Sequence, residues 1–199
     1  PSADVTVSFD SDDAAEGTVA PNSLIFTPVN WNAPQNVTVT GVDDSIADGN
    51  QPYRIVFVAT VSNDATYAAI TPQSIVVINT DDDSAGILVS PISGPTTEGG
   101  DTATFTVALT SRPSDDVTLA LVSSDATEGD ISAASLTFTA VNWNAPQTVT
   151  VTGADDQIAD GNQTYVINFT SVVSNDLAYA TLSPSGVTVV NTDNDSAGV

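Results

Sequence analysis

The sequence predicts an all-β fold made of tandem immunoglobulin-like antiparallel β-sandwich repeats of 112 residues. The first observation is an internal repeat: the pentapeptide Trp-Asn-Ala-Pro-Gln begins at Trp31 and again 112 positions later at Trp143. Residues 31–86 and 143–198 align without gaps at 36 identities in 56 positions. The second observation is that apolar residues recur with period two, as in 104–109, and Gly, Pro, Asn and Asp clusters separate these runs.

One repeat contains seven such alternating runs, which is typical of an immunoglobulin-like sandwich. Thr occupies many of the alternate positions, and a β-branched polar residue suits the solvated face of a strand. No stretch has the periodicity of a good helix. In order, the predicted strands are 87–90, 102–110, 117–123, 135–139, 147–152, 164–173 and 186–191.

The repeat is out of register with the ends of the chain. Residues 87–199 form one complete repeat, whereas residues 1–86 match only the last three-quarters of another and lack its first two strands. Either those strands precede Pro1 in a longer protein, or another chain supplies them by β-strand addition. We favour a segment of a longer repeat array over a subunit of a head-to-tail filament.

The composition excludes several classes of function. The chain has no Cys, His or Lys, and its only cationic side chains are Arg54 and Arg112. Disulfides, thiolate or imidazole metal sites and His or Cys catalysis are therefore excluded. A formal net charge of −23 argues against nucleic acid as a partner. No apolar run approaches the roughly 20 residues that a membrane-spanning helix needs.

The carboxylates are unevenly placed along the repeat. If consecutive strands run antiparallel, the connections after the first, third and fifth strands lie at one end of the sandwich with the exit from the last. Nineteen of the 25 carboxylates fall at this end of their repeat. A salt-adapted, evenly solvated acidic surface is the alternative, but it would spread them over both ends.

Carboxylates that crowd together need cations, because their mutual repulsion is costly at reduced dielectric. Calcium accepts 6–8 oxygen ligands in flexible geometry, whereas magnesium demands a stricter octahedron. The loop Asp155–Asn162, which recurs as Asp43–Asn50, holds three carboxylates within six residues. The sequence therefore predicts a Ca²⁺ site at one end of each sandwich, although the spacing is not that of an EF-hand.

Four motifs resemble the Calx-beta family over the whole repeat. They are Glu98-Gly99 after the first strand, Asp-x-x-x-Gly from Asp125, Asp-Asp-x-Ile-x-Asp from Asp155, and the closing Asp-Asn-Asp from Asp193. The family includes calcium-sensing domains of sodium–calcium exchangers and tandem modules of bacterial surface adhesins. The wording Phe-Thr-x-x-Asn-Trp-Asn-x-Pro-Gln resembles the bacterial modules more closely.

The resemblance implies calcium ligands at matching positions. Two departures imply fewer ions or weaker binding: Gly161, Asn162 and Gln163 stand where the exchanger pattern is acidic, and Asn194 replaces a carboxylate. Glu16 and Glu128 join the candidates because the antiparallel arrangement places them at the same end. The predicted ligands are Asp13, Glu16, Asp43, Asp44, Asp48, Asp81 and Asp83 in the first repeat and Glu98, Asp125, Glu128, Asp155, Asp156, Asp160, Asp193 and Asp195 in the second.

These observations favour a structural function. We expect a calcium-stabilised spacer of a long extracellular protein or fibre at a bacterial cell surface, with neighbouring repeats as its partners and metal stiffening each junction. Two alternatives remain open: a glycan- or protein-binding adhesin module, and a hydrolase with paired carboxylates. We expect no enzyme activity, because near-identical duplication suits stacking repeats better than a single active site.

Overall fold

The computed structural model describes residues 1–198, and they divide into two compact units. The first comprises Pro1–Asp44 and Asp48–Asp82, and the second comprises Ser45–Ala47 and the chain from Asp83 onward. The division at Asp82 lies close to the predicted boundary at residue 86. Both helices of the described chain have four residues, and none is long and apolar enough to cross a membrane.

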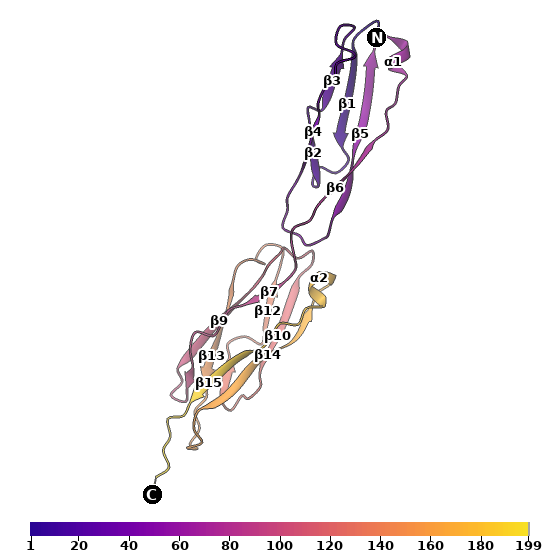
Figure 1. Cartoon of the computed structure of the whole chain (residues 1–199). Coiled ribbons are helices and arrows are strands. Elements are labelled where there is room, and N and C mark those ends of the chain that lie inside the picture. Colours follow the sequence, from indigo (N-terminus) through magenta and orange to yellow (C-terminus); the bar gives the residue numbers. More distant parts are fainter. Residues whose placement is uncertain (199) are drawn as a thin grey trace. The chain divides into compact units, whose positions relative to one another are not determined.

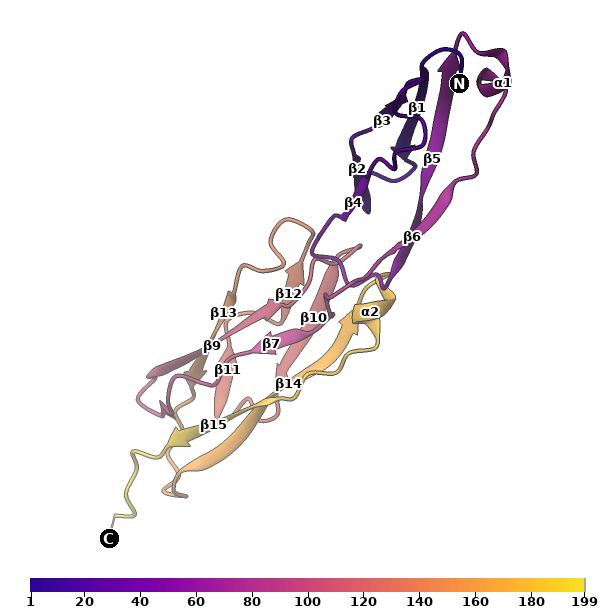
Figure 2. The ribbon, with the colours of Figure 1, turned by 45° about the horizontal axis from the view of Figure 1, so that its top comes forward.

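The second unit is a sandwich of two mainly antiparallel sheets (Figure 1, Figure 2). One sheet has the order β12-β10-β14-β15-β8 and the other the order β11-β13-β9-β7. Its elements are β7 (Ile87–Val89), β8 (Thr96–Thr97), β9 (Thr102–Leu109), β10 (Val117–Ser123), β11 (Gly129–Ile131), β12 (Ser135–Phe138), β13 (Gln147–Gly153), β14 (Gln163–Val173), α2 (Leu177–Ala180) and β15 (Val187–Thr192).

The period-two pattern determines which side chains fill this sandwich. Along β9, Phe105 and Val107 are 1% and 0% exposed, and they meet Leu119, Val149 and Ile167 from other strands in one apolar core. The intervening Thr residues of β9 are more exposed. The predicted β-sandwich and all seven of its strands are therefore present.

Three short elements were not predicted. The strands β8 and β11 have only two and three residues, too few to show a period. The single turn α2 depends on a cap: the Asp176 carboxylate accepts hydrogen bonds from the Ala178 N–H (2.9 Å) and the Ser114 N–H (2.8 Å). Tyr179 of α2 is 1% exposed and donates to the Ser111 carbonyl at 2.6 Å, so its side chain packs into the core.

The first unit has a four-stranded sheet of order β3-β1-β5-β6 and a separate pair, β2-β4. Its buried core contains Phe9, Tyr53 and Ile55. The Phe9 and Phe57 rings pack edge to face, with their centroids 5.9 Å apart. The two sheets contain no strand that corresponds to β7 or β9. The elements are β1 (Val5–Ser11), β2 (Gly17–Ala20), β3 (Ser23–Phe26), β4 (Thr38–Gly41), β5 (Gln51–Ser62), α1 (Ala65–Ala68) and β6 (Ile75–Asn79).

We expect the amides of β4 to exchange with solvent at least about 100-fold faster than those of β13, its counterpart. In β4, Val39 is 39% exposed, whereas the corresponding Val151 is fully buried. A strand with few buried contacts opens at a lower free-energy cost, and 100-fold corresponds to about 2.7 kcal/mol. Hydrogen exchange followed by mass spectrometry or NMR measures the ratio. Tyr53 and Tyr165, which are buried alike, are the internal control, and equal protection of β4 and β13 would refute the expectation.

Candidate metal centre

One end of the second unit collects carboxylates from four segments of the chain. These segments follow β8, precede β11, connect β13 to β14 and follow β15. Within each of two groups, every residue has a carboxylate oxygen within 4.8 Å of the others' oxygens. The first group is Glu98, Asp193 and Asp195, and the second is Glu128, Asp156 and Asp160.

The pairing of β8 with β15 positions the first group. These strands run parallel, with Thr97 opposite Thr192, so Glu98 lies beside the chain that leaves β15. Glu98 is 3% exposed as a residue, and its carboxylate accepts a hydrogen bond from the Asn194 N–H at 3.0 Å. Segments almost a hundred residues apart are thereby joined at one site.

Backbone donors hold Asp193 in place. Its carboxylate accepts from the Asp195 N–H and from the Gly161 N–H, each at 2.7 Å. These two bonds lower the pKa of Asp193 below 3.8, so it is ionised at neutral pH. The Gly161 bond also ties the predicted loop, residues 155–162, to the exit from β15. Gly161 has a φ of 78°, a left-handed conformation that favours glycine.

Asp195 Oδ2 is buried and has no hydrogen-bond partner within the described chain. A buried carboxylate oxygen without a donor is costly unless a cation compensates it. With only two Arg side chains for 25 carboxylates, the chain has few cationic groups of its own. Three convergent carboxylates, one with an unpaired buried oxygen, fit a hard divalent cation, and Glu98, Asp193 and Asp195 would hold it.

Opposing influences act on the pKa of Glu98. The hydrogen bond from Asn194 lowers it, but burial and the negative charges of Asp193, Asp156 and Asp195 raise it, and the net shift is upward from 4.5. The metal-free site therefore penalises the ionised form of Glu98, and a bound cation would relieve that penalty.

This shift predicts how Glu98→Gln changes the pH dependence of stability in the presence of chelator. A carboxyl whose pKa is raised by folding contributes stability below its unfolded pKa, 4.5, and this contribution is lost as pH rises through its folded pKa. Denaturant unfolding at a series of pH values should therefore show wild type losing stability relative to Glu98→Gln as pH rises above 4.5. A difference that does not change with pH would contradict the prediction.

The second group rests on a buried polar network that sequence reasoning missed. The Asn191 amide donates to Glu128 Oε2 at 3.4 Å and to the Ala154 carbonyl at 2.9 Å. Thr96 Oγ1 donates to Asn191 Oδ1 at 3.1 Å and lies 3.2 Å from the Tyr165 hydroxyl. The sequence did hold a signal for this network. Asn191 is a polar residue at an inward-facing position of the last strand, and the first repeat has Asn79 at the same position.

Burial raises the pKa of Tyr165, and the negative charge of Glu128 raises it further. The hydrogen bond with Thr96 lowers this pKa, but the net shift is upward. Tyr165 is therefore a neutral phenol in this network at neutral pH. Glu128 itself is 8% exposed, whereas Asp156 is half-buried and Asp160 is exposed. Asp156 Oδ1 accepts a hydrogen bond from the Ile158 N–H at 2.7 Å, which shapes the loop.

Two predicted ligands of the second unit lie outside both groups among the described residues. Asp125 accepts from the Thr127 hydroxyl at 2.5 Å and from the Thr127 N–H at 3.0 Å. These bonds lower its pKa, as expected of a turn-forming carboxylate. Asp155 is exposed beside Asp156, which belongs to the second group.

The first unit repeats part of this arrangement. Asp81 Oδ2 accepts from the Gly49 N–H at 2.6 Å, matching Asp193 and Gly161. Asn79 donates to Glu16 Oε2 at 3.2 Å, matching Asn191 and Glu128.

Other predicted ligands of the first repeat differ in their surroundings. Asp43 and Asp82 of the first unit have carboxylate oxygens within 4.8 Å of each other. Asp82 was not among the predicted ligands, although it is the middle residue of three consecutive Asp residues, 81–83, of which the other two were. Asp13 accepts from the Ala15 N–H at 3.0 Å, as in a turn. Asp44 and Asp48 belong to the first unit and flank Ser45–Ala47, a short segment that belongs to the second unit. Asp83 also belongs to the second unit.

Comparisons with known proteins concern the fold. No protein-family model and no curated protein matches the sequence. Among solved structures, the chain is similar to the S-layer protein rSbsC(31-844), with a TM-score of 0.34 and 16% identity over 97% of this chain and 20% of that one. It is also similar to the calcium binding domain CBD12 of CALX1.1, with a TM-score of 0.34 and 13% identity over 86% of this chain and 68% of that one.

At these identities the likeness concerns the fold alone. The chain spans about one fifth of the length of the S-layer protein that it matches. The sheet topology of the second unit itself places it in the antiparallel β-sandwich class, and one end of this unit is acidic.

Proposed function

We propose that this chain is a calcium-stabilised spacer segment of a long extracellular surface protein or fibre. The observation that carries the proposal is the group formed by Glu98, Asp193 and Asp195, in which Asp195 Oδ2 is buried without a hydrogen-bond partner among residues 1–198. This group joins the connection after β8 to the exit from β15. A bound ion would act as a clip between chain segments that are distant in sequence.

The donor set favours calcium over other common metals. Every candidate ligand is a carboxylate, which suits Ca²⁺ and disfavours metals that prefer nitrogen or sulfur. Magnesium keeps most of its water shell, so partly buried carboxylates from separate loops suit it less. The modest number of carboxylates per group agrees with the weak affinities, about 10⁻⁴–10⁻³ M, of extracellular modules.

The spacer role rests on the duplication and on what the duplicated residues do. Gly49 with Asp81 and Gly161 with Asp193 form the same contact in both repeats, so the duplicated loops serve the sandwich that carries them. This use favours a structural role over catalysis. We propose neighbouring repeats as the partners of such a spacer and a stiffer connection between repeats in calcium.

Calorimetric titration with Ca²⁺ and with Mg²⁺, paired with thermal melts in each ion and in chelator, tests the proposal. We expect saturable Ca²⁺ binding with a rise in melting temperature, and a much smaller response to Mg²⁺. Spin labels in the two units should give a narrower distance distribution in calcium than in chelator if the ion also stiffens the connection. Identical melts in calcium and chelator would overturn the calcium role.

A further inference from the structure

The short strand that leads into Glu98 is anchored by polar contacts. It is β8, which consists of Thr96 and Thr97 alone and therefore has no large apolar side chain to bury in the core. Thr96 is nevertheless fully buried. Glu98 follows directly, and its N–H donates to the Thr192 carbonyl at 3.1 Å. The position of Glu98 therefore depends on what holds this two-residue strand.

The hydrogen bonds around Thr96 have one consistent direction. The side-chain amide nitrogen of Asn191 faces two acceptors, the Ala154 carbonyl (2.9 Å) and Glu128 Oε2 (3.4 Å), so Asn191 Oδ1 must accept. Thr96 Oγ1 lies 3.1 Å from Asn191 Oδ1 and donates its single proton there. The Tyr165 hydroxyl, 3.2 Å from Thr96 Oγ1, is then the donor in that contact. One chain of hydrogen bonds thus starts at Tyr165 and ends at Glu128.

This chain of hydrogen bonds lies in tightly packed surroundings. Thr96, Asn191 and Tyr165 are 0%, 1% and 2% exposed. A Cβ at Gly129 would overlap the Tyr165 hydroxyl, and a Cβ at Gly153 would lie 2.6 Å from Asn191 Oδ1. A polar group that loses its partner here stays unpaired, because the neighbouring backbone leaves little room for a water molecule to replace that partner.

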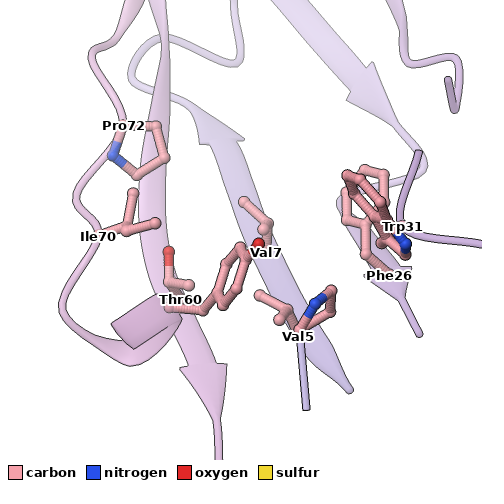
Figure 3. Close-up of a pocket in the computed structure, with 9 residues that line it drawn as sticks. Val5, Val7, Phe26, Trp31, Thr60, Ile70 and Pro72 are labelled. Atoms are coloured by element: carbon pink, nitrogen blue, oxygen red, sulfur yellow. The ribbon is translucent and has the colours of Figure 1, made fainter. Parts of the chain in front are cut away.

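Burial alone does not give a threonine hydroxyl such partners. Thr60 of the first unit also has a buried Oγ1, but this atom has no hydrogen-bond partner among residues 1–198. Figure 3 shows its setting, a groove in which the other labelled side chains are apolar. The corresponding residue of the second repeat is Val172, so this position does not require a hydroxyl. Thr96 differs, because two polar side chains contact its hydroxyl.

We propose that Thr96 is a positioning residue of the metal centre, and that its hydroxyl holds Glu98 beside Asp193 for the cation. Thr96 lies two residues before Glu98, and its acceptor Asn191 lies two residues before Asp193. The hydrogen bond between them therefore fixes where the two following carboxylates lie relative to each other. The inference rests on the calcium role proposed above, and it adds a residue outside the ligand set that keeps the ligands together. Loss of such an outer partner typically lowers metal affinity about 10–100-fold.

Thr96→Val tests the proposal, since valine has a similar shape to threonine and lacks the hydroxyl. We expect the dissociation constant for Ca²⁺ at the second unit to rise at least about 10-fold. NMR signals of the Gly161 and Asn194 amides follow binding at this unit, because these N–H groups donate to its carboxylates. In chelator the same two amides should exchange faster with solvent, which reports on the carboxylate positions without metal. Thr96→Ser restores the hydroxyl and should recover most of the affinity.

Three further variants separate positioning from a general loss of stability. Tyr165→Phe removes the donor to Thr96 and should also weaken calcium binding. Tyr179→Phe removes an equally buried hydroxyl, which donates to the Ser111 carbonyl at 2.6 Å and contacts neither carboxylate group. It should lower the melting temperature in chelator and leave the calcium affinity unchanged. Thr60→Val is the matched control for the threonine substitution and should also leave the calcium affinity unchanged.

The outcomes distinguish this inference from the calcium role itself. If the wild type binds calcium and Thr96→Val binds it equally well, Thr96 is not a positioning residue, although the calcium role stands. Equal losses in Thr96→Val and Thr96→Ser would assign the effect to side-chain shape and overturn the role of the hydroxyl. If Thr96→Val does not fold, Tyr165→Phe and Tyr179→Phe decide, and equal affinities in these two overturn the inference. A wild type that does not bind calcium overturns the calcium role and this inference together.

Discussion

Replacing Asp195 by Asn is expected to remove most of the calcium-dependent rise in the melting temperature of the second unit without lowering its stability in chelator. Asp195 Oδ2 is buried and has no hydrogen-bond partner in the described chain, so without a cation its charge lowers the stability of the unit and does not add to it. Saturation at about 100 times the dissociation constant stabilises a site by about 2.7 kcal/mol. For a unit of this size that is about 10 °C, of which less than half should remain in the variant.

The companion variant Glu98→Gln should show the same loss in calcium and a gain in chelator. In the wild type, burial and three neighbouring carboxylates raise the pKa of Glu98. A neutral amide at this position therefore relieves repulsion that otherwise only a bound ion offsets. Asp116→Asn is the matched control, because Asp116 is exposed and belongs to neither group. Calorimetric melts of the four proteins with and without calcium decide the matter. A calcium response in Asp195→Asn equal to that of Asp116→Asn would exclude Asp195 as a ligand.

The strands of the sandwich could be predicted because their signal is local. Alternation along β9 or β13 reflects which face of one strand is buried, and the residues of that strand suffice to show it. The strand β8 has two residues, and it exists because Thr96 and Thr97 lie beside β15, more than ninety positions away. No local pattern records such a pairing.

The acidic segments of the candidate site were also predictable, but the converging oxygens were not. Asp155 and Asp156 are adjacent in an irregular loop, and only the second joins a carboxylate group. Asp125 is a carboxylate in a motif that predicts a ligand, yet its side chain accepts hydrogen bonds from Thr127 and forms part of a turn. Turn geometry decides both cases, and it depends on backbone conformations that the sequence pattern does not specify.

The duplication separates local from tertiary effects within one chain. Gly49 and Gly161 share a φ of 78° and donate to corresponding carboxylates, so the loop conformation follows from its own residues. Burial does not repeat in the same way, since Val39 is 39% exposed and Val151 is fully buried. The strand β9 accounts for this difference, because it covers Val151 and has no counterpart in the first unit.

Gly153→Ala is expected to destabilise the second unit by about 2–3 kcal/mol, or about 10 °C, even in chelator. A Cβ at Gly153 would lie 2.2 Å from the Thr97 carbonyl oxygen and 2.6 Å from Asn191 Oδ1. The first contact is with backbone, which cannot rotate away as a flexible side chain would. The calcium response should fall as well, because Thr97 precedes Glu98 directly and the displaced segment carries that ligand.

Two further glycines provide a graded control for this prediction. At Gly41, which corresponds to Gly153, a Cβ would meet only the Asn79 side chain, at 2.4 Å from Oδ1, so Gly41→Ala should cost less. At Gly94 a Cβ would meet nothing within 4 Å, so Gly94→Ala should change stability by less than about 0.5 kcal/mol. Chemical denaturation of the three variants in chelator measures the order of their stabilities. A Gly153→Ala protein as stable as Gly94→Ala would mean that the Thr97 backbone does not lie against Gly153. The gradient follows from geometry: the cost rises as the obstacle changes from open space to a side chain and then to the backbone that positions Glu98.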